Sequence, residues 1–186
     1  MQRLAAILAL ATPFARKRNH RNDFDMELDR FDRQLLNLVQ KNAMQTAEQM
    51  AEVVALSPSA VQRRLRRMRE QGTIANYVAV IDPAHVGKPV TFIVAVQVER
   101  EGAALLDQFK KWISEQDQVQ QAFYVTGEAD FILVVTAPDT EAYDALMSRM
   151  VHDNPNVKRF TTNVTLNTVK RGLTIPVPLG TAGTSA

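Results

Sequence analysis

The sequence is notable first for what it lacks. None of its 186 residues is cysteine, which excludes a disulfide framework, thiolate zinc sites, iron–sulfur clusters and a cysteine nucleophile. His20, His85 and His152 are scattered, and none has a second histidine three to five residues away, so neither a metal site nor a catalytic triad is indicated. The seven glycines form no GxGxxG or GxxxxGK phosphate loop. We therefore expect no enzyme, no metal and no cofactor.

The N-terminal region has no apolar run long enough for a membrane span. The run at residues 4–11 has eight residues, which is short for a signal peptide and far below the ~18 needed to cross a bilayer. The basic stretch at residues 16–21 follows it. We interpret residues 1–25 as a flexible basic extension that could touch phosphates, and we expect a cytoplasmic protein with no membrane partner.

A net charge of +2 is also too small to indicate a nucleic-acid partner by itself, but its distribution is uneven. The net charge is +3 over residues 1–25, +2 over residues 26–81 and −3 over residues 82–186. A basic N-terminal part and an acidic C-terminal part indicate an anionic partner bound at one end of the chain.

Residues 26–81 show the pattern of a helix-turn-helix domain. Apolar residues spaced by three or four from Leu28 to Val39 predict a first helix. Thr46 is a suitable N-cap for a short second helix, and Ser57 followed by Pro58 predicts the start of a third helix. That third helix occupies the position of a recognition helix.

The third helix has five arginines between positions 63 and 69. Arginine suits phosphate oxygens and the major-groove edge of guanine. The N-terminal part of a recognition helix reaches base edges, so the predicted base readers are Ser59, Gln62 and Arg63. Arg66 and Arg67 lie one turn later and are predicted to contact phosphates. A solvated basic helix face is the alternative.

Two further segments complete the N-terminal half. The β-type residues after Gly72 predict a short ribbon, read as a wing, that ends at Asp82-Pro83; these residues are Ile74, Tyr77, Val78, Val80 and Ile81. A plain cap on the helical core is the alternative role. Residues 82–89 have two prolines and a glycine and are predicted to be a linker.

Residues 90–174 predict a second, α+β domain. Strand patterns at 90–98, 119–125, 131–137 and 157–168 alternate with helical patterns around Leu105–Ile113 and behind Asp139. The order βαββαβ is that of a ferredoxin-like sheet with both helices on one face. The other face needs a cover, for which a second subunit is the economical choice. Residues 175–186 are rich in Pro, Gly, Thr and Ser and are predicted to be a disordered tail.

These segments together resemble the Lrp/AsnC family (leucine-responsive regulatory protein/asparagine regulator) of prokaryotic transcription factors over about residues 27–176. The motifs that carry the resemblance, in order, are Leu28-Asp29-xx-Asp32-xx-Leu35-Leu36, Leu56-Ser57-Pro58-Ser59-xx-Gln62-Arg63-Arg64-Leu65, Glu70-Gln71-Gly72-x-Ile74-xx-Tyr77, Asp82-Pro83-xxx-Gly87 and Val125-Thr126-Gly127-Glu128-Ala129-Asp130-Phe131. The resemblance implies a winged helix-turn-helix that binds double-stranded DNA, followed by a ferredoxin-like (RAM, ACT-like) domain. It also implies a homodimer that assembles to a tetramer or octamer.

The resemblance also assigns the candidate sites. The residues that match the family's DNA-contacting helix are Ser57, Ser59, Gln62, Arg63 and Arg66. The turn Val125, Thr126, Gly127, Glu128 and Asp130 matches the loop of an effector site between subunits, where an amino acid or a related small molecule is expected. In this turn glycine frees backbone N–H groups for a carboxylate, and Glu128 or Asp130 could pair with an ammonium group; a plain hairpin with a charged tip is the alternative.

Two positions depart from the family pattern. Ala55 stands where the family usually has glycine in the helix-turn-helix turn, which puts the turn geometry in question. Met44 replaces a common arginine before the second helix.

The predicted function is a sequence-specific regulator of amino-acid metabolism. The alternatives are a nucleoid-type architectural protein, an enzyme and an RNA binder, although no aromatic RNP pattern lies on the strands.

Overall fold

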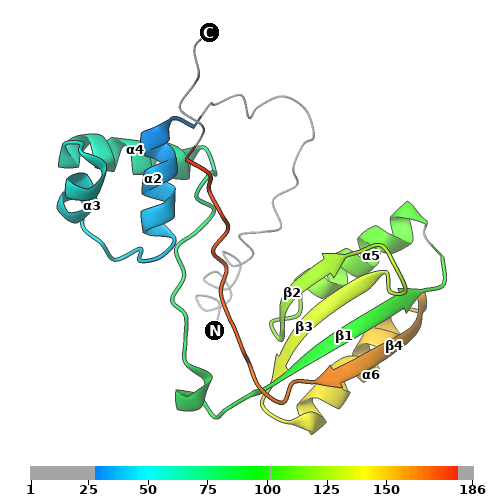
Figure 1. Ribbon diagram of the computed structural model, residues 1–186. Helices are drawn as coiled ribbons and strands as arrows, with labels where there is room; N and C mark the ends of the chain where they lie inside the picture. Colours follow the sequence, from blue (N-terminus) through cyan, green and yellow to red (C-terminus); the bar gives the residue numbers. More distant parts are fainter. Residues whose placement is uncertain (1–27, 101, 180–186) are drawn as a thin grey trace, which may run out of the picture. The chain divides into compact units, whose positions relative to one another are not determined.

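A computed structural model describes residues 28–100 and 102–179, which form two compact units (Figure 1). Within this part, one unit contains residues up to Ala79 together with the segment from Arg171 onward, and the other contains Val80–Lys170. The predicted flexible extension at 1–25 and residues 180–186 of the predicted tail lie outside the described residues. No helix in the described part is long and apolar enough to cross a membrane.

Three helices form the helix-turn-helix unit, as the apolar spacing predicted. They are α2 (Arg30–Val39), α3 (Ala47–Val54) and α4 (Pro58–Glu70). Reciprocal capping boxes begin the first two, at Asp29 with Asp32 and at Thr46 with Gln49. Their facing sides bury a small core whose fully enclosed members include Leu35, Val61 and Met68.

The ribbon predicted after the third helix does not form. Ile74 bonds through its N–H to the Met68 carbonyl at 3.0 Å and packs against the helical core, but residues 75–82 adopt no strand. A strand requires a neighbour for its backbone groups, and the described residues of this unit supply none. The linker that follows is not wholly irregular, because Pro83–His85 form a short 3₁₀ helix, η1, capped by Asp82.

The second unit has the predicted βαββαβ order. Its elements are β1 (Val90–Val98), α5 (Ala103–Ser114), β2 (Val119–Tyr124), β3 (Phe131–Ala137), α6 (Thr140–Asp153) and β4 (Val157–Val164). The strands form one antiparallel sheet in the order β2-β3-β1-β4. The last strand is four residues shorter than the sequence pattern predicted.

Both helices of this unit cover the same face of the sheet (Figure 1). Alternate residues of the central strands point into that core, among them Phe92 and Val94 of β1 and Leu133 of β3, all fully buried. The opposite face carries Ile93 beside Val134, and Phe123 beside Ile132. Phe123 is 50% exposed, so this face presents apolar surface with no helix of this unit over it.

The end of the described chain returns to the helix-turn-helix unit. Ile175, Val177 and Pro178 are hydrogen-bonded to side chains of α2 and of its C-cap residue. Thus residues 175–178, which composition assigned to a disordered tail, have specific partners in the first unit. Side-chain groups along α2 supply these bonds, and such a pairing leaves no periodic signal in the sequence of the tail.

Candidate nucleic-acid interface and effector loop

Serine and proline at the start of α4 fix where the recognition helix begins. The Ser57 hydroxyl accepts a hydrogen bond from the Ala60 N–H at 3.3 Å and lies 3.1 Å from the Ser59 hydroxyl. Pro58 occupies the first turn, where its missing N–H costs no helical bond. Both serines are exposed, so the predicted Ser57 and Ser59 lie at the surface where the helix starts.

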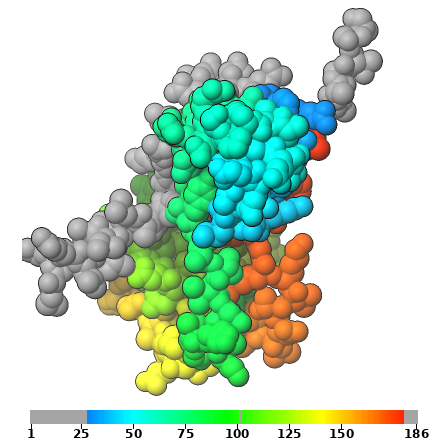
Figure 2. Space-filling model, turned by 90° about the vertical axis from the view of Figure 1, so that its left-hand side faces the viewer, coloured from blue at the N-terminus to red at the C-terminus, as the bar shows by residue number. Residues whose placement is uncertain are grey.

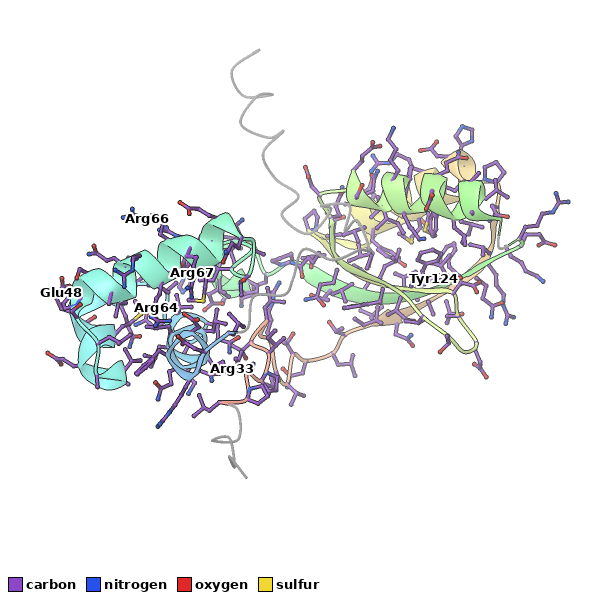
Figure 3. All side chains as sticks on the ribbon, turned by 90° about the horizontal axis from the view of Figure 1, so that it is seen from above. Arg33, Glu48, Arg64, Arg66, Arg67 and Tyr124 are labelled. Carbon is purple, nitrogen blue, oxygen red and sulfur yellow. The ribbon has the colours of Figure 1, made fainter. Side chains whose placement is uncertain are left out.

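The arginines of α4 divide between two faces of the helix. Gln62, Arg63 and Arg66 are exposed, and Figure 3 shows Arg66 on the side of α4 that points away from α2. Arg64 and Arg67 instead lie between α4 and α2 (Figure 3). The exposed face offers guanidinium and amide donors in an arrangement that suits DNA phosphates and base edges. In Figure 2, α3 and α4 lie at the surface of their unit (cyan to green).

The inner face of α4 is held by a buried carboxylate. Asp32 of α2 is 1% exposed, and its two oxygens lie 2.8 Å from Arg64 Nη1 and 2.8 Å from Arg67 Nη2. Arg64 also reaches Asp29 at 2.7 Å and stacks over the Phe31 ring. A buried charge is tolerated when it is paired and hydrogen-bonded, so this cluster fixes α4 against α2.

The ionisation of this cluster follows from its contacts. Desolvation disfavours the charged form of Asp29, but the Asp32 backbone N–H and the Arg64 guanidinium outweigh it, and the pKa of Asp29 falls below its usual 3.8. Desolvation likewise opposes the charge on Arg64, whereas Asp32 and Asp29 favour it and raise the pKa of Arg64. Asp29 and Arg64 therefore remain ionised at neutral pH.

Arg67 thus forms an ion pair with Asp32 of α2, and its predicted contact with phosphates stays a prediction. The sequence reasoning placed Arg67 on the outer face because helical angles alone do not show a partner 35 residues earlier. Arg67 Nε is buried and has no hydrogen-bond partner among the described residues. The Arg67 guanidinium is paired with the Asp32 carboxylate while 41% of its side chain stays exposed. Arg63 and Arg66 are the two more exposed arginines among the predicted contacts.

A groove beside α4 brings predicted contact residues together with two cations that the sequence did not assign to DNA contact. It has a volume of about 880 Å³ and lies between the α2–α3 connection, one face of α4 and residues 77–79. Gln62 and Arg66 line it together with Lys41, Arg69 and Tyr77. Lys41 and Arg69 are exposed cations and are additional candidates for phosphate contact. Their signal in the sequence was charge alone, which does not separate them from other surface cations.

The turn of the helix-turn-helix contains a left-handed residue. Ala55, which caps the C-terminus of α3, has φ 55° and ψ 46°. This is the region that glycine occupies without steric cost and that costs an L-residue about 1–2 kcal/mol. The geometry of the turn is therefore the one that glycine would favour, retained here with alanine.

In the second unit, the predicted effector loop is a compact turn between β2 and β3. The Val125 N–H donates to the Asp130 carbonyl at 2.9 Å, and the Asp130 N–H donates to the Val96 carbonyl at 2.9 Å. Gly127 is exposed with φ 126°, a conformation that strongly favours glycine. Thr126 and Glu128 are exposed beside it, so the tip of the loop is accessible to a small ligand.

Asp130 has a structural partner that the sequence did not reveal. Its Oδ2 accepts the N–H of Val98 at 2.8 Å and so joins the loop to the end of β1. In the part of the chain that the structure describes, no hydrogen bond or ion pair engages the carboxylate of Glu128. Of the two acids proposed to pair with an ammonium group, Glu128 is therefore the one whose carboxylate has no partner among the described residues.

Two side chains from neighbouring strands hold this loop. The Gln97 amide nitrogen donates to the Glu128 carbonyl, and Arg159 Nε of β4 donates to the Gln97 Oε1 at 2.7 Å. These two residues are paired across β1 and β4. Sequence reasoning missed both, because their relation to the loop depends on strand register across 62 residues.

Candidate sites of other kinds are not evident in the described structure. His85 and His152 are exposed. Across residues 28–100 and 102–179, no three His, Asp or Glu side chains are grouped as metal ligands.

A helix-turn-helix with an arginine-lined recognition helix, joined to a ferredoxin-like sheet with an accessible loop, defines a DNA-binding transcriptional regulator. The sequence profile for the AsnC-type helix-turn-helix domain matches residues 28–69, and the profile for the Lrp/AsnC ligand binding domain matches residues 91–175. The chain belongs to the Lrp/AsnC family of transcriptional regulators, which confirms the resemblance and the α+β fold class predicted from sequence.

Relatives and solved structures agree with this assignment. The chain is 46% identical to an uncharacterised HTH-type transcriptional regulator of Sinorhizobium fredii, over 84% of this chain and 93% of the relative. It is 29% identical to the leucine-responsive regulatory protein of Escherichia coli K12, over 78% of this chain and 88% of the relative.

Among solved structures, an AsnC family regulator from Agrobacterium tumefaciens matches with a TM-score of 0.73 and 29% identity, over 80% of this chain and 96% of that one. A transcriptional regulator of Neisseria meningitidis, solved as a complex with L-Met, matches with a TM-score of 0.73 and 25% identity, over 81% of this chain and 97% of that one.

Proposed function

We propose that this protein is a cytoplasmic, sequence-specific DNA-binding regulator of amino-acid metabolism, not an enzyme, and that an amino acid or a related small molecule controls it. The observation that carries the proposal is that the two faces of α4 differ: one is bound to α2 and the other is exposed. Arg64 and Arg67 fix the helix through Asp32, while Gln62, Arg63 and Arg66 are left exposed. A helix held rigidly by one face and presenting donors on the other suits base readout.

The effector is proposed to bind at the loop from Val125 to Asp130, between subunits of a homo-oligomer. Support comes from the exposed tip of the loop, the positive φ of Gly127, and the Glu128 carboxylate, which has no partner among the described residues. Two related proteins were solved with L-methionine, the regulator from Neisseria meningitidis and a feast or famine regulatory protein from M. tuberculosis. An α-amino acid would place its carboxylate against N–H groups and its ammonium group against an acid.

Oligomerisation is proposed to cover the apolar face of the sheet. Ile93, Val134 and Phe123 lie on the side opposite α5 and α6, and a contiguous apolar surface favours contact with a second copy. One recognition helix makes few base contacts. The recognition helices of two subunits are therefore expected to bind half-sites about one turn of the DNA double helix apart.

Selection of binding sites from random duplex DNA by the full-length protein tests the DNA-binding proposal. Enrichment of a roughly palindromic sequence supports it. Equal recovery of all sequences, together with a steep salt dependence, would instead favour the nucleoid-type architectural alternative.

A melting-temperature screen tests the effector proposal. The full-length protein is heated with each amino acid at millimolar concentration. A ligand at about 100 times its Kd raises the free energy of unfolding by roughly 2.7 kcal/mol. Stabilisation by one amino acid or a few related ones supports the proposal, and no shift with any of them contradicts it. Light scattering in the same buffers gives the oligomeric state.

A further inference from the structure

One face of α2 is lined by polar side chains. Arg33, Asn37 and the C-cap residue Gln40 form a stripe along this face, spaced by four and then three residues. Each of them is hydrogen-bonded to the C-terminal segment Ile175–Pro178. Figure 3 shows Arg33 on the side of its unit where this segment lies.

The bonds are made to backbone atoms of the segment. Asn37 Nδ2 donates to the Val177 carbonyl at 2.8 Å, and Arg33 Nη1 donates to the Pro178 carbonyl at 3.2 Å. The Gln40 amide binds Ile175 twice: its Nε2 donates to the carbonyl at 2.8 Å and its Oε1 accepts the N–H at 3.0 Å. The Ile175 side chain is 68% exposed, so the contact there depends on its backbone.

The length of the α2 stripe agrees with the length of the C-terminal segment that it binds. Arg33 and Gln40 are seven positions apart, which along an α-helix is roughly 10.5 Å at 1.5 Å per position. Ile175 and Pro178 are three positions apart, which along an extended polyproline-type chain is roughly 9 Å at 3.1 Å per position. The segment runs antiparallel to α2, because Gln40 binds its start and Arg33 binds its end.

The sequence of the segment favours this extended form. Pro176 and Pro178 fix their own φ near −65° and have no N–H to satisfy. The residue before each of them, Ile175 or Val177, is disfavoured in the helical region. The segment therefore loses little conformational entropy on docking, and its carbonyl groups are available for the donors of α2.

We propose that the Arg33–Asn37–Gln40 face of α2 is a binding site for an extended peptide backbone, and that its occupant is the chain's own C-terminal segment, Ile175–Pro178. The DNA-binding unit is then joined to the sheet unit by two covalent connections, one near residue 80 and one near residue 170. The second connection ends on α2, which carries the Asp32 carboxylate that fixes α4. The sheet unit is thereby linked to the helix that supports the recognition helix.

Site-directed crosslinking in the full-length chain tests this proposal. Since the natural sequence has no cysteine, the pair Asn37→Cys and Val177→Cys gives two unique thiols, while Arg33 and Gln40 keep their bonds. A short thiol-specific crosslinker should join them within one chain. Glu48→Cys with Val177→Cys is the matched control, because Glu48 is an exposed residue of α3, away from Arg33 in Figure 3. A yield no higher than that of the control would overturn the docking, and a product of two-chain size would overturn the choice of occupant.

A matched substitution tests whether the backbone is what α2 recognises. Ile175→Pro removes the N–H that donates to Gln40, whereas Ile175→Ala retains it. In the double-cysteine background, the proline variant and Gln40→Leu should each lower the crosslinking yield toward that of the Glu48 control, and the alanine variant should not. Circular dichroism verifies that every variant is folded. Equal crosslinking of the proline and alanine variants would contradict backbone recognition.

Discussion

Arg67 Nη2 lies 2.8 Å from the Oδ2 of Asp32, a carboxylate that is almost completely buried. This contact pairs Arg67 with α2, although 41% of the Arg67 side chain is exposed. Arg67→Ala should therefore lower the free energy of unfolding by roughly 1–3 kcal/mol, because the loss of the partly exposed Arg67 leaves Asp32 with Arg64 alone. Chemical unfolding of the full-length protein measures the change.

Arg66 is the matched control for that experiment, because it is the neighbouring arginine on the exposed side of α4. Arg66→Ala should change the stability by no more than about 0.5 kcal/mol. It should weaken binding to all DNA sequences and reduce the slope of log affinity against log salt by about 1. If Arg67→Ala kept full stability and reduced the salt slope instead, the role derived from its ion pair would be wrong.

Arg63 is expected to contribute sequence discrimination. It is exposed in the first half of α4, where recognition helices reach base edges. Arg63→Ala should reduce the preference for the selected site over random DNA by ~1–3 kcal/mol, the value of one bidentate contact with a base. Competition binding at constant salt measures the preference. Unchanged discrimination by the double variant Arg63→Ala, Arg66→Ala would refute the assignment of α4 as the reading helix.

Ala55 offers a test of the turn geometry. Replacing it with glycine relieves a left-handed conformation that costs alanine about 1–2 kcal/mol, while the greater freedom of glycine in the unfolded chain returns about 0.4–1 kcal/mol. Ala55→Gly should therefore raise the free energy of unfolding by roughly 0.5–1 kcal/mol. The side chain is exposed, so no packing is lost. Destabilisation in thermal and chemical unfolding would show that the turn is not left-handed at this residue.

The acid sensitivity of the helix-turn-helix unit should depend on Asp29. Its pKa in the folded chain is below the ordinary 3.8, so its contribution to stability is complete above that value and is lost as the pH falls through the folded pKa. An asparagine at this position would still cap α2 but would carry no charge. Asp29→Asn should thus make the free energy of unfolding fall less steeply below about pH 4. Urea unfolding between about pH 2.5 and 7 measures this, with Asp117→Asn as an exposed control. Parallel acid curves for the wild type and Asp29→Asn would contradict it.

Much of the fold could be predicted because the decisive signals are local. Apolar spacing, the caps at Thr46, Ser57 and Asp139, and strand alternation located the helices and strands within a few residues. Where the structure differs from the prediction, the cause is the presence or absence of a partner that is distant in sequence. Residues 74–81 have the composition of a strand but pair with no strand among the described residues, and Ile175 belongs to a tail segment that is hydrogen-bonded to Gln40.

The same distinction applies to the candidate sites. Exposure of Gln62, Arg63 and Arg66 follows from helical periodicity, so the sequence could place them. The engagement of Arg67 with Asp32, and the support that Gln97 gives to the effector loop, depend on how distant segments pack. Neither leaves a pattern in nearby residues.

Asp130 should be tested with two substitutions, because it combines a charge with a structural bond to β1. Asp130→Ala removes the acceptor of the Val98 N–H and should lower the melting temperature even without ligand, at a cost of about 1–3 kcal/mol. Asp130→Asn retains an acceptor oxygen and should keep most of that stability. If the carboxylate pairs with the ammonium group of an effector, Asp130→Asn should still abolish the ligand-induced melting shift. A full shift with Asp130→Asn would assign the ammonium contact elsewhere, with Glu128→Gln as the next variant to measure.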